Sequence, residues 1–483
     1  MKKRLLAILS VVLVCAMIFV ACSKDNADGF SESYTQTDIT EQSESESESE
    51  TKQDVKLTTY RVENNIDKIS ESTMGIEFCA SYTDAILVSV TSNKVVKYKV
   101  YVNGTETGTI TVTVSKSPKE LPGTADKAGE KVFIRLSRVE YNVEDTVTFI
   151  DIRLNGTLHT LDDEIGGVAT NYKIAENKDK INILGRSVDN QNGITADWSA
   201  SGIEFRASYT GAVKISAVLD NSMEVTFRAY VNGVETGDIK FTKSGEALTI
   251  PGTAAAAGEN VLIRLARVQY VYEGMITLCE ISLNGTLKAW SEDRPLIEFC
   301  GDSITCGFGS VTNDNFRDGT RTYAFLAANE LGADYSMVSV SGIKTGGLAD
   351  NYDYVNFVRN NTTVKYTPER KADLVVIHLG TNDYGAKTDE TTFKNDAKRL
   401  ISKVRNTHEA DVKIVWVIGH MVPADCDIYA WVKEVFTELG GNGLYTVTTT
   451  MNTAGGVGHP NYASHKVTAA DLVTFIKNNG LLN

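Results

Sequence analysis

The sequence lacks the cysteine and histidine spacing of a metal site. It has seven cysteines and six histidines among 483 residues, with no CxxC pair and no Cys/His ligand pattern. Beyond residue 22 the cysteines are scattered and odd in number, which indicates buried thiols; they are Cys79, Cys279, Cys300, Cys306 and Cys426. We therefore expect no metal, and nothing in the sequence implies an organic cofactor.

The sequence also lacks basic patches. The formal net charge is −14 at pH 7, whereas phosphate binding requires clustered lysine and arginine. This excludes nucleic acid as an expected partner. Much of the acidity lies in residues 23–55, which hold ten acidic and two basic residues and include the run SESESESE. A segment of this composition cannot bury a core, so we predict a disordered acidic Ser/Glu tether.

The first 22 residues have the layout of an export signal. Basic residues at positions 2–4 precede an apolar run, and small Ala21 stands before Cys22. The stretch FVAC resembles a bacterial lipoprotein signal. This resemblance implies that Cys22 is acylated and becomes the mature N-terminus, anchoring the protein at the cell surface through lipid alone. Ordinary secretion is the alternative.

Residues 56–165 and 170–292 are two copies of one domain. GIEFCASYT at Gly75 returns as GIEFRASYT at Gly202, and most matching segments lie 129 residues apart, too far for a solenoid period. Alternating runs such as KYKVYVNG and VTFRAYVNG end in Asn-Gly, the hairpin signal. The pattern predicts two antiparallel β-sandwich domains of jelly-roll type. Each is either a carbohydrate-binding module or a packing spacer.

The pattern changes at residue 293. Apolar runs alternate with helical stretches; the runs are LIEFCGDS, YSMVSVSG, DLVVIHLG and KIVWVIGH. Continuous apolar strands separated by helices predict a three-layer α/β/α domain over residues 293–483, with a parallel sheet covered on both faces. Ligands of such sheets bind at the carboxyl ends of the strands.

The predicted strand ends carry a nucleophile, hydrogen-bond donors and a base. Ser303 follows the first strand, and a serine hydroxyl becomes nucleophilic when a base lies within hydrogen-bond reach. The N–H groups of Ser303 and Gly342 and the side chain of Asn382 could stabilise an oxyanion. His459, in the last loop, and His420, after the fourth strand, are the candidate bases.

These residues stand in four ordered blocks, GDSITCGFG, VSGI, GTND and HPN, which resemble those of the SGNH/GDSL hydrolases. Residues 183–208, leading through the second β domain into the first block, are similar to carbohydrate esterase family 2, the acetyl esterases of plant cell-wall polysaccharides. The resemblance implies Ser303 as nucleophile and His459 as general base. It further implies an oxyanion hole built from Ser303, Gly342 and Asn382.

The activity implied by this resemblance is a serine esterase that removes O-acetyl groups from xylan or glucomannan through an acyl-enzyme. One alternative is an SGNH esterase on another acyl substrate, such as O-acetylated peptidoglycan or a lipid. Another is a non-catalytic glycan-binding surface lipoprotein. Lesser candidates for sugar contact are Phe308, Tyr384, Tyr429, Trp431 and His420, which can equally pack in the interior.

No acid stands near His459 in the sequence. The superfamily typically has an aspartate three residues before the histidine, where this chain has Gly456, and no acid occurs from 452 to 470. We favour a Ser-His dyad whose Nδ1–H donates to a backbone carbonyl. A carboxylate from a distant loop and His420 as the base remain open alternatives. The loops that could supply the carboxylate contain Asp314, Asp318 and Asp425. Asp302 and Asp383 are expected to hold loops instead.

Overall fold

The computed structural model describes residues 57–65, 68–72, 74–139, 145–160, 169–220, 223–269, 274–311, 317–357, 364–450 and 452–482. The chain divides into two units, residues 1–54 and 55–483, and every described residue belongs to the second. The predicted export signal with Cys22, and the acidic segment, therefore lie outside the described residues. Within the described part of the chain, no helix is both long and apolar enough to cross a membrane.

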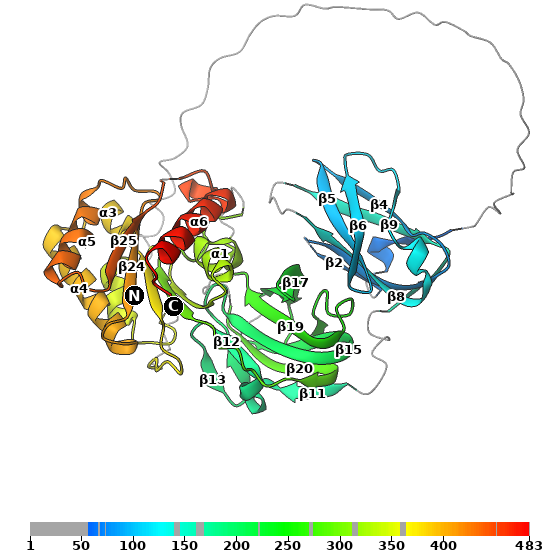
Figure 1. Cartoon of the computed structure of the whole chain (residues 1–483), viewed down its shortest axis with the longest axis horizontal. Helices are drawn as coiled ribbons and strands as arrows, with labels where there is room; N and C mark the ends of the chain where they lie inside the picture. Colours follow the sequence, from blue (N-terminus) through cyan, green and yellow to red (C-terminus); the bar gives the residue numbers. More distant parts are fainter. Residues whose placement is uncertain are drawn as a thin grey trace, which may run out of the picture. The chain divides into compact units, whose positions relative to one another are not determined.

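The first β domain consists of two antiparallel sheets (Figure 1). Its strands are β1 Thr58–Arg61, β2 Ile69–Ser72, β3 Gly75–Tyr82, β4 Leu87–Ser92, β5 Val96–Val102, β6 Thr105–Val112, β7 Lys119–Glu120, β8 Gly129–Arg138, β9 Val147–Leu154 and β10 Gly156–His159. One sheet has the order β1-β9-β4-β7; the other has the order β10-β3-β8-β5-β6, with β2 paired to β3. Alternate residues of β5 enter the core, as the two-residue period predicts.

The second β domain forms one ten-stranded antiparallel sheet. Its strands are β11 Thr170–Lys173, β12 Ile181–Leu184, β13 Val188–Asn190, β14 Gly193–Thr195, β15 Gly202–Leu219, β16 Val225–Val231, β17 Val234–Phe241, β18 Ala247–Thr249, β19 Gly258–Arg267 and β20 Ile276–Leu287. The long strands β15 and β20 run through regions that the first copy splits into β3 and β4 and into β9 and β10. Register shifts in β15 mark where the strand is irregular.

Both copies turn at the predicted Asn-Gly hairpins. Asn103 and Gly104 have φ of 48° and 76°, and Asn232 and Gly233 have φ of 50° and 77°. Positive φ at both central residues is the signature of the two-residue turn that matches the twist of paired strands. The hairpins β5/β6 and β16/β17 therefore follow directly from the sequence.

The C-terminal part is a five-stranded parallel sheet with helices on both faces. The strand order is β22-β21-β23-β24-β25. The elements are β21 Leu296–Gly301, α1 Tyr323–Glu330, β22 Asp334–Ser339, α2 Thr345–Asn351, β23 Leu374–His378, α3 Thr381–Gly385, α4 Glu390–Thr407, β24 Lys413–Ile418, α5 Asp427–Glu438, β25 Leu444–Thr448 and α6 Tyr462–Asn478. Helices α1 and α6 cover one face, and α2, α4 and α5 cover the other (Figure 1). The predicted layering is confirmed.

The second β domain and the α/β part share their cores. Trp198, in the loop before β15, is fully buried in the same cluster as Trp416 of β24, and its Nε1–H donates to the carbonyl of Val355 at 2.8 Å. On the other face of the sheet, the Tyr335 hydroxyl donates to the Ala200 carbonyl at 2.9 Å. The two parts therefore pack as one body despite the sequence change at residue 293.

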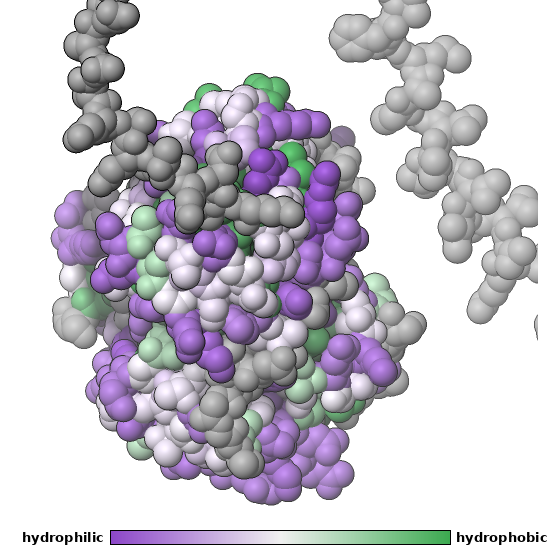
Figure 2. All heavy atoms as spheres, turned by 90° about the vertical axis from the view of Figure 1, so that its right-hand side faces the viewer, coloured by the Kyte–Doolittle hydropathy of each residue, from purple (hydrophilic) through white to green (hydrophobic). Residues whose placement is uncertain are grey.

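Figure 2 shows a face of the molecule on which hydrophilic residues predominate and hydrophobic ones are scattered. The large hydrophobic side chains that are exposed are mostly single valines along strands and loops, among them Val95, Val114 and Val234. Isolated apolar residues of this kind are normal on a protein surface in water.

Candidate active site

The structure brings Ser303 and His459 into hydrogen-bond contact. Ser303 lies two residues after the end of the central strand β21 and is 5% exposed. His459 follows the short 3-10 turn Gly456–Gly458 that precedes α6. Its Nε2 is 2.9 Å from the Ser303 Oγ, although the two residues are 156 positions apart in sequence. This is the distance that a serine nucleophile and its base require.

A backbone carbonyl lies on the other side of the imidazole. Nδ1 of His459 is 3.2 Å from the carbonyl oxygen of Val457. Because a carbonyl can only accept, Nδ1 carries the proton, and the lone pair of Nε2 is left to accept the Ser303 hydroxyl. Burial lowers the pKa of His459, the carbonyl contacts partly oppose this, and Arg317 adds to it. The imidazole is therefore neutral near pH 7, as a base must be.

Neither of the two described carboxylates that the sequence offered as partners contacts His459. Asp318 is buried against Arg228, and Asp425 is exposed in the loop before α5. Asp314 lies outside the described residues. Asp302, beside Ser303, accepts from the Ile304 N–H at 3.0 Å. Burial raises the pKa of Asp302 to about 7, and the nearby Asp383 adds to this.

Asp383 holds the start of α2. Its carboxylate accepts from the Thr345 N–H at 3.0 Å and from the Thr345 hydroxyl at 2.9 Å. Burial raises the pKa of Asp383, and the two Thr345 contacts oppose the rise. Both aspartates next to the predicted site therefore organise loops.

Three further histidines are buried behind the site. His420 Nε2 lies 2.5 Å from the Thr468 hydroxyl, His378 Nε2 lies 3.3 Å from the Gly419 carbonyl, and His465 Nδ1 accepts from the Tyr323 N–H at 3.2 Å. Burial lowers the pKa of His378 to about 3 and that of His420 to about 4. The position of His420, 1% exposed and bound to α6, does not suit a base for Ser303.

Two of the three predicted oxyanion donors, Gly342 and Asn382, border an open pocket of about 640 Å³. Gly342 follows β22 with φ of +81° and faces open space. Asn382, in α3, donates through Nδ2 to the Ile343 carbonyl at 2.9 Å and to Asp302 Oδ2 at 3.2 Å. The pocket is lined by Gly342, Lys344, Thr381, Asn382, Tyr384, Gly385, Ala386, Met421 and Val422. The longer contact, to Asp302, is the one that an oxyanion could replace.

The lesser candidates for sugar contact fall into two groups, one near the site and one in the core. Tyr384 is 47% exposed and lines the pocket, and the Phe308 ring packs on His459 with centroids 4.6 Å apart. Trp431 instead packs against Phe393 within the core cluster of α4 and α5, and Tyr429 is fully buried. Trp431, Tyr429 and His420 do not line the pocket. Helical periodicity turns the two α5 residues toward the interior, and His420, in the loop after β24, is buried against Thr468 of α6.

The sequence predicts a backbone carbonyl as the partner of His459 Nδ1 but does not identify it as that of Val457, and it gives no signal for Lys344 or Arg317. A backbone acceptor has no letter in a sequence; its only signal was the glycine-rich GGVG that lets a chain turn tightly. Val457 has φ of 52° and Gly458 has φ of 71°. Residues other than glycine and asparagine seldom adopt such positive φ angles. The loop is thus built to aim one carbonyl at the imidazole.

Gly455 has too little space around it for a side chain. A Cβ there would lie 2.6 Å from the carbonyl oxygens of Gly309 and His459. We expect Gly455→Ala to shift the loop and lower kcat by about 10- to 100-fold, because small displacements of a catalytic group are costly. Gly458→Asn is the matched control, since asparagine accepts positive φ and a Cβ at this position meets nothing. Equal kcat for the two variants, measured on an aryl acetate, would contradict the carbonyl's role.

Comparisons with known proteins place this domain among esterases. Residues 299–465 match the GDSL-like Lipase/Acylhydrolase family. The chain is 30% identical over 321 residues to the cellulase/esterase CelE of Acetivibrio thermocellus, covering 59% of this chain and 38% of that protein. It is 25% identical over 179 residues to an acetylxylan esterase/glucomannan deacetylase of Cellvibrio japonicus, covering 31% and 49%. The chain thus spans less than half the length of either relative.

Solved structures extend the likeness beyond residues 299–465. A family two carbohydrate esterase from Clostridium thermocellum, in complex with cellohexaose, is 25% identical with a TM-score of 0.55, covering 62% of this chain and all of that one. An acetyl xylan esterase from Butyrivibrio proteoclasticus, 19% identical with a TM-score of 0.59, covers 66% of this chain and 100% of its own, and shares the fold. The C-terminal domain of this chain therefore contains a GDSL-like lipase/acylhydrolase domain over residues 299–465, and its neighbours are esterases that include a family two carbohydrate esterase.

Proposed function

We propose that the protein is a serine esterase that removes O-acetyl groups from plant cell-wall polysaccharides. The observation that carries this proposal is the contact between Ser303 Oγ and His459 Nε2 at 2.9 Å, with His459 Nδ1 facing the Val457 carbonyl. No carboxylate contacts His459 among the residues that the structure describes, which supports a Ser-His dyad. It supplies a nucleophile and a base whose tautomer is fixed.

In the first half of the reaction, Ser303 Oγ attacks the acetyl carbonyl carbon while its proton passes to His459 Nε2. The carbonyl π electrons move to oxygen, and the N–H groups of Ser303 and Gly342 and the amide of Asn382 stabilise that oxyanion. The bond between the acetyl carbon and the sugar oxygen then breaks. The sugar oxygen takes the proton from His459 and leaves as an alcohol, so that acetyl-Ser303 remains.

In the second half, a water molecule replaces the sugar. His459 Nε2 accepts a proton from water as its oxygen attacks the acetyl-Ser303 carbonyl, and the second oxyanion uses the same donors. Collapse breaks the ester bond to Ser303 Oγ, which recovers the proton from His459, and acetate departs. The cycle consumes one water and needs no group beyond the residues described.

A polysaccharide substrate is supported by the pocket and by the relatives. The pocket is open rather than enclosed and presents Tyr384 at its rim, which suits a chain that passes across the surface better than a buried acyl tail. The names of the curated relatives include acetylxylan esterase, glucomannan deacetylase and cellulase/esterase, and one structural neighbour binds cellohexaose. We include in the proposal the jelly-roll assignment of the two β domains.

The proposed place of action is the outside of the cell. The basic start, apolar run and Cys22 of the sequence support an exported lipoprotein, and the acidic residues 23–55 would extend the enzyme from its anchor. Globomycin-sensitive processing and loss of membrane association in Cys22→Ser would support the anchor, whereas secretion unaffected by Cys22→Ser would contradict it.

Product analysis tests the substrate class. The purified protein is incubated with acetylated glucomannan, acetylated xylan and O-acetylated peptidoglycan, and released acetate and residual acetyl positions are followed by NMR. We expect release from one or both plant polysaccharides and little from peptidoglycan. Release from peptidoglycan alone would replace the substrate class. No release from any of them, with retention on a glycan resin, would favour the non-catalytic binding protein.

A further inference from the structure

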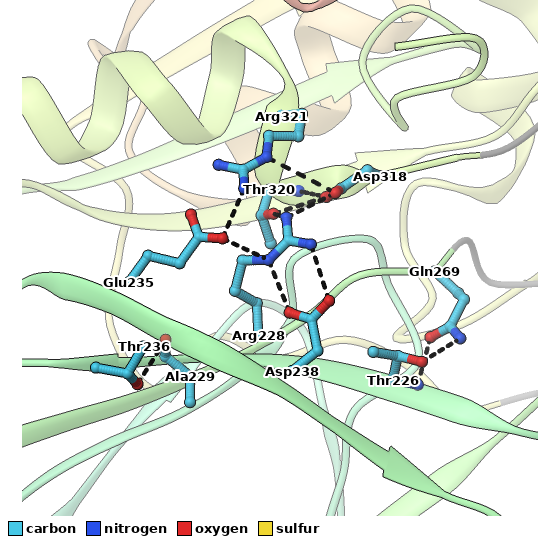
Figure 3. Close-up of polar contacts among 10 residues, drawn as sticks. All are labelled: Thr226, Arg228, Ala229, Glu235, Thr236, Asp238, Gln269, Asp318, Thr320 and Arg321. Atoms are coloured by element: carbon cyan, nitrogen blue, oxygen red, sulfur yellow. Dashed lines mark hydrogen bonds and ion pairs between the residues drawn. The ribbon is translucent and has the colours of Figure 1, made fainter. Parts of the chain in front are cut away.

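The second β domain contributes a buried arginine to a charge cluster at the α/β domain (Figure 3). Arg228 of β16 is 3% exposed at its side chain and binds Asp238 of β17 through two bonds of 2.9 and 3.1 Å. Its Nη1 also donates to Asp318 Oδ2 at 2.6 Å. Glu235 accepts from Arg321 Nη2 at 2.6 Å and forms an ion pair with Arg228, whose Nε lies 3.1 Å from Glu235 Oε1. We call Arg228, Glu235, Asp238, Asp318 and Arg321 the interdomain charge cluster.

The cluster fixes the loop that enters α1. Asp318 caps the 3-10 turn Gly319–Arg321 by accepting from the Thr320 N–H at 2.9 Å. The N–H of Gly319 donates to the Val268 carbonyl of the second β domain at 2.9 Å. A Cβ at Gly319 would lie 2.7 Å from the Ala200 nitrogen. This loop of the α/β domain is therefore attached to the β domain by side chains and by main chain.

The same loop reaches the catalytic histidine. The Asp318 N–H donates to the Gly307 carbonyl at 3.3 Å, and the neighbouring residues Phe308 and Arg317 pair as an antiparallel bridge. The Arg317 guanidinium lies 4.6 Å from the centroid of the Phe308 ring. That ring in turn packs on His459 with centroids 4.6 Å apart.

A main-chain route runs in parallel. The Gly456 N–H donates to the Gly309 carbonyl at 3.1 Å, and Gly456 is next to Val457, whose carbonyl faces His459 Nδ1. The segment 307–309 therefore contacts His459 directly through the Phe308 ring and also contacts, at Gly456, the loop that carries the orienting carbonyl. A histidine without a carboxylate depends on such neighbours for its position.

We propose that Arg228 and Asp318 are positioning residues for His459, so that the second β domain is a working part of the active site rather than a separate module. This inference rests on the proposed function of the Ser303–His459 pair. Taking five charged groups out of water is costly, and apolar residues could hold two domains together at lower cost. What the charges add is direction. Asp238 binds the Arg228 guanidinium through two bonds, and this fixed guanidinium presents Nη1 to Asp318 Oδ2 and to the Thr320 hydroxyl, each at 2.6 Å. The orientation of the Asp318 loop is thereby fixed.

The first β domain supplies an internal comparison. Arg228 and Glu235 correspond, 129 residues earlier, to Lys99 and Glu106. That pair is also formed, at 2.9 Å, but its side chains are 43% and 44% exposed, and Thr109 stands where Asp238 does in the second copy. The duplicated frame thus holds an ordinary surface ion pair in one copy and the interdomain charge cluster only where the domain meets the α/β part.

The test compares Asp318→Asn and Arg228→Lys with Lys99→Met and Glu106→Gln. Asp318→Asn keeps the oxygen that caps Thr320 but removes the charge, and Arg228→Lys keeps the charge but loses the fork. On an aryl acetate we expect both cluster variants to lower kcat by about 10- to 100-fold with little change in KM, and to shift the acidic limb of the kcat/KM profile. The first-domain variants are expected to match the wild type.

A second readout does not depend on turnover. The imidazole signals of His459, assigned by their loss in His459→Gln, are titrated by NMR in each folded variant. Changed chemical shifts and pKa of His459 in Asp318→Asn, but not in Glu106→Gln, would support the positioning role even if the acetyl substrates were wrong. If both the His459 signal and kcat are unchanged in Asp318→Asn, the positioning role is wrong and the esterase proposal still stands. If Asp318→Asn shifts the His459 signal but the wild type hydrolyses no acetyl ester, the esterase proposal alone is rejected.

Discussion

Alanine at Ser303 is expected to lower kcat/KM for an aryl acetate by about 10⁴-fold or more, without loss of the fold. The Ser303 Oγ contacts His459 Nε2, while the local turn is held by the main chain, in which the Ser303 carbonyl accepts from the Phe308 N–H at 2.9 Å. Alanine removes the nucleophile and leaves that bond. The measurement is steady-state hydrolysis with circular dichroism and thermal melting as the check on folding.

The same experiment separates the two candidate bases. His459→Gln is expected to lower kcat/KM to a similar value. The double variant Ser303→Ala/His459→Gln should have no lower kcat/KM, because the effects of substituting residues that act as one unit do not add. His420→Gln is the matched control: its imidazole is bound to Thr468, so kcat should stay close to wild type while stability decreases. Full turnover in Ser303→Ala, or loss of turnover in His420→Gln with retained turnover in His459→Gln, would reject the assignment.

Three of the site residues that the sequence predicts share one physical property. Ser303, Gly342 and Asn382 follow strands of a parallel sheet, and the carboxyl ends of such strands meet at one edge. Because the apolar runs predict a parallel sheet, Ser303, Gly342 and Asn382 are expected to lie close together at its edge. In the structure Ser303 contacts His459, and Gly342 and Asn382 line a pocket. Periodicity also predicted the hairpins, since Asn-Gly selects one turn type.

What the sequence could not supply depends on docking between distant segments. Arg228 and Asp318 are 90 residues apart on different domains, and no local pattern states that β16 will face the loop before α1. Trp198 belongs by sequence to the β repeat but is buried in the core of the α/β part. Trp431 could be read as a sugar contact because an aromatic residue looks the same on either face of a helix until the partner of that helix is known.

A second docking contact has a large expected effect on stability. Glu298, in the middle of β21, accepts from Arg186 of the second β domain through two bonds, at 3.0 and 3.1 Å. The exposed fractions of the two side chains are 1% and 0%. The Arg186 guanidinium also stacks 4.4 Å from the Tyr352 ring centroid and 4.0 Å from that of Tyr366. This ion pair is therefore removed from water on every side.

Glu298→Gln is expected to lower the free energy of unfolding by about 3–5 kcal/mol, because it leaves the Arg186 charge buried without a counter-charge. Urea unfolding followed by tryptophan fluorescence measures the change, since Trp198 and Trp416 lie in the shared core. Glu176→Gln is the control. Glu176 pairs with Lys173 on the surface, where the two side chains are 67% and 64% exposed, so no measurable change in the free energy of unfolding is expected. Arg186→Met/Glu298→Leu, which removes both charges, should be more stable than Glu298→Gln.

The Glu298–Arg186 pair should also make the free energy of unfolding depend on pH in acid. Burial by itself would raise the pKa of Glu298, but Arg186 and His408 hold it well below its ordinary value of 4.5. The unfolded chain thus binds the proton more readily than the folded chain, so the stabilisation is complete above pH 4.5 and declines as the pH falls below it. Glu298→Gln has no such proton to bind. The difference in unfolding free energy between wild type and Glu298→Gln should therefore be constant near neutrality and narrow in acid, and a difference that widens in acid would show that the carboxylate is not held by Arg186.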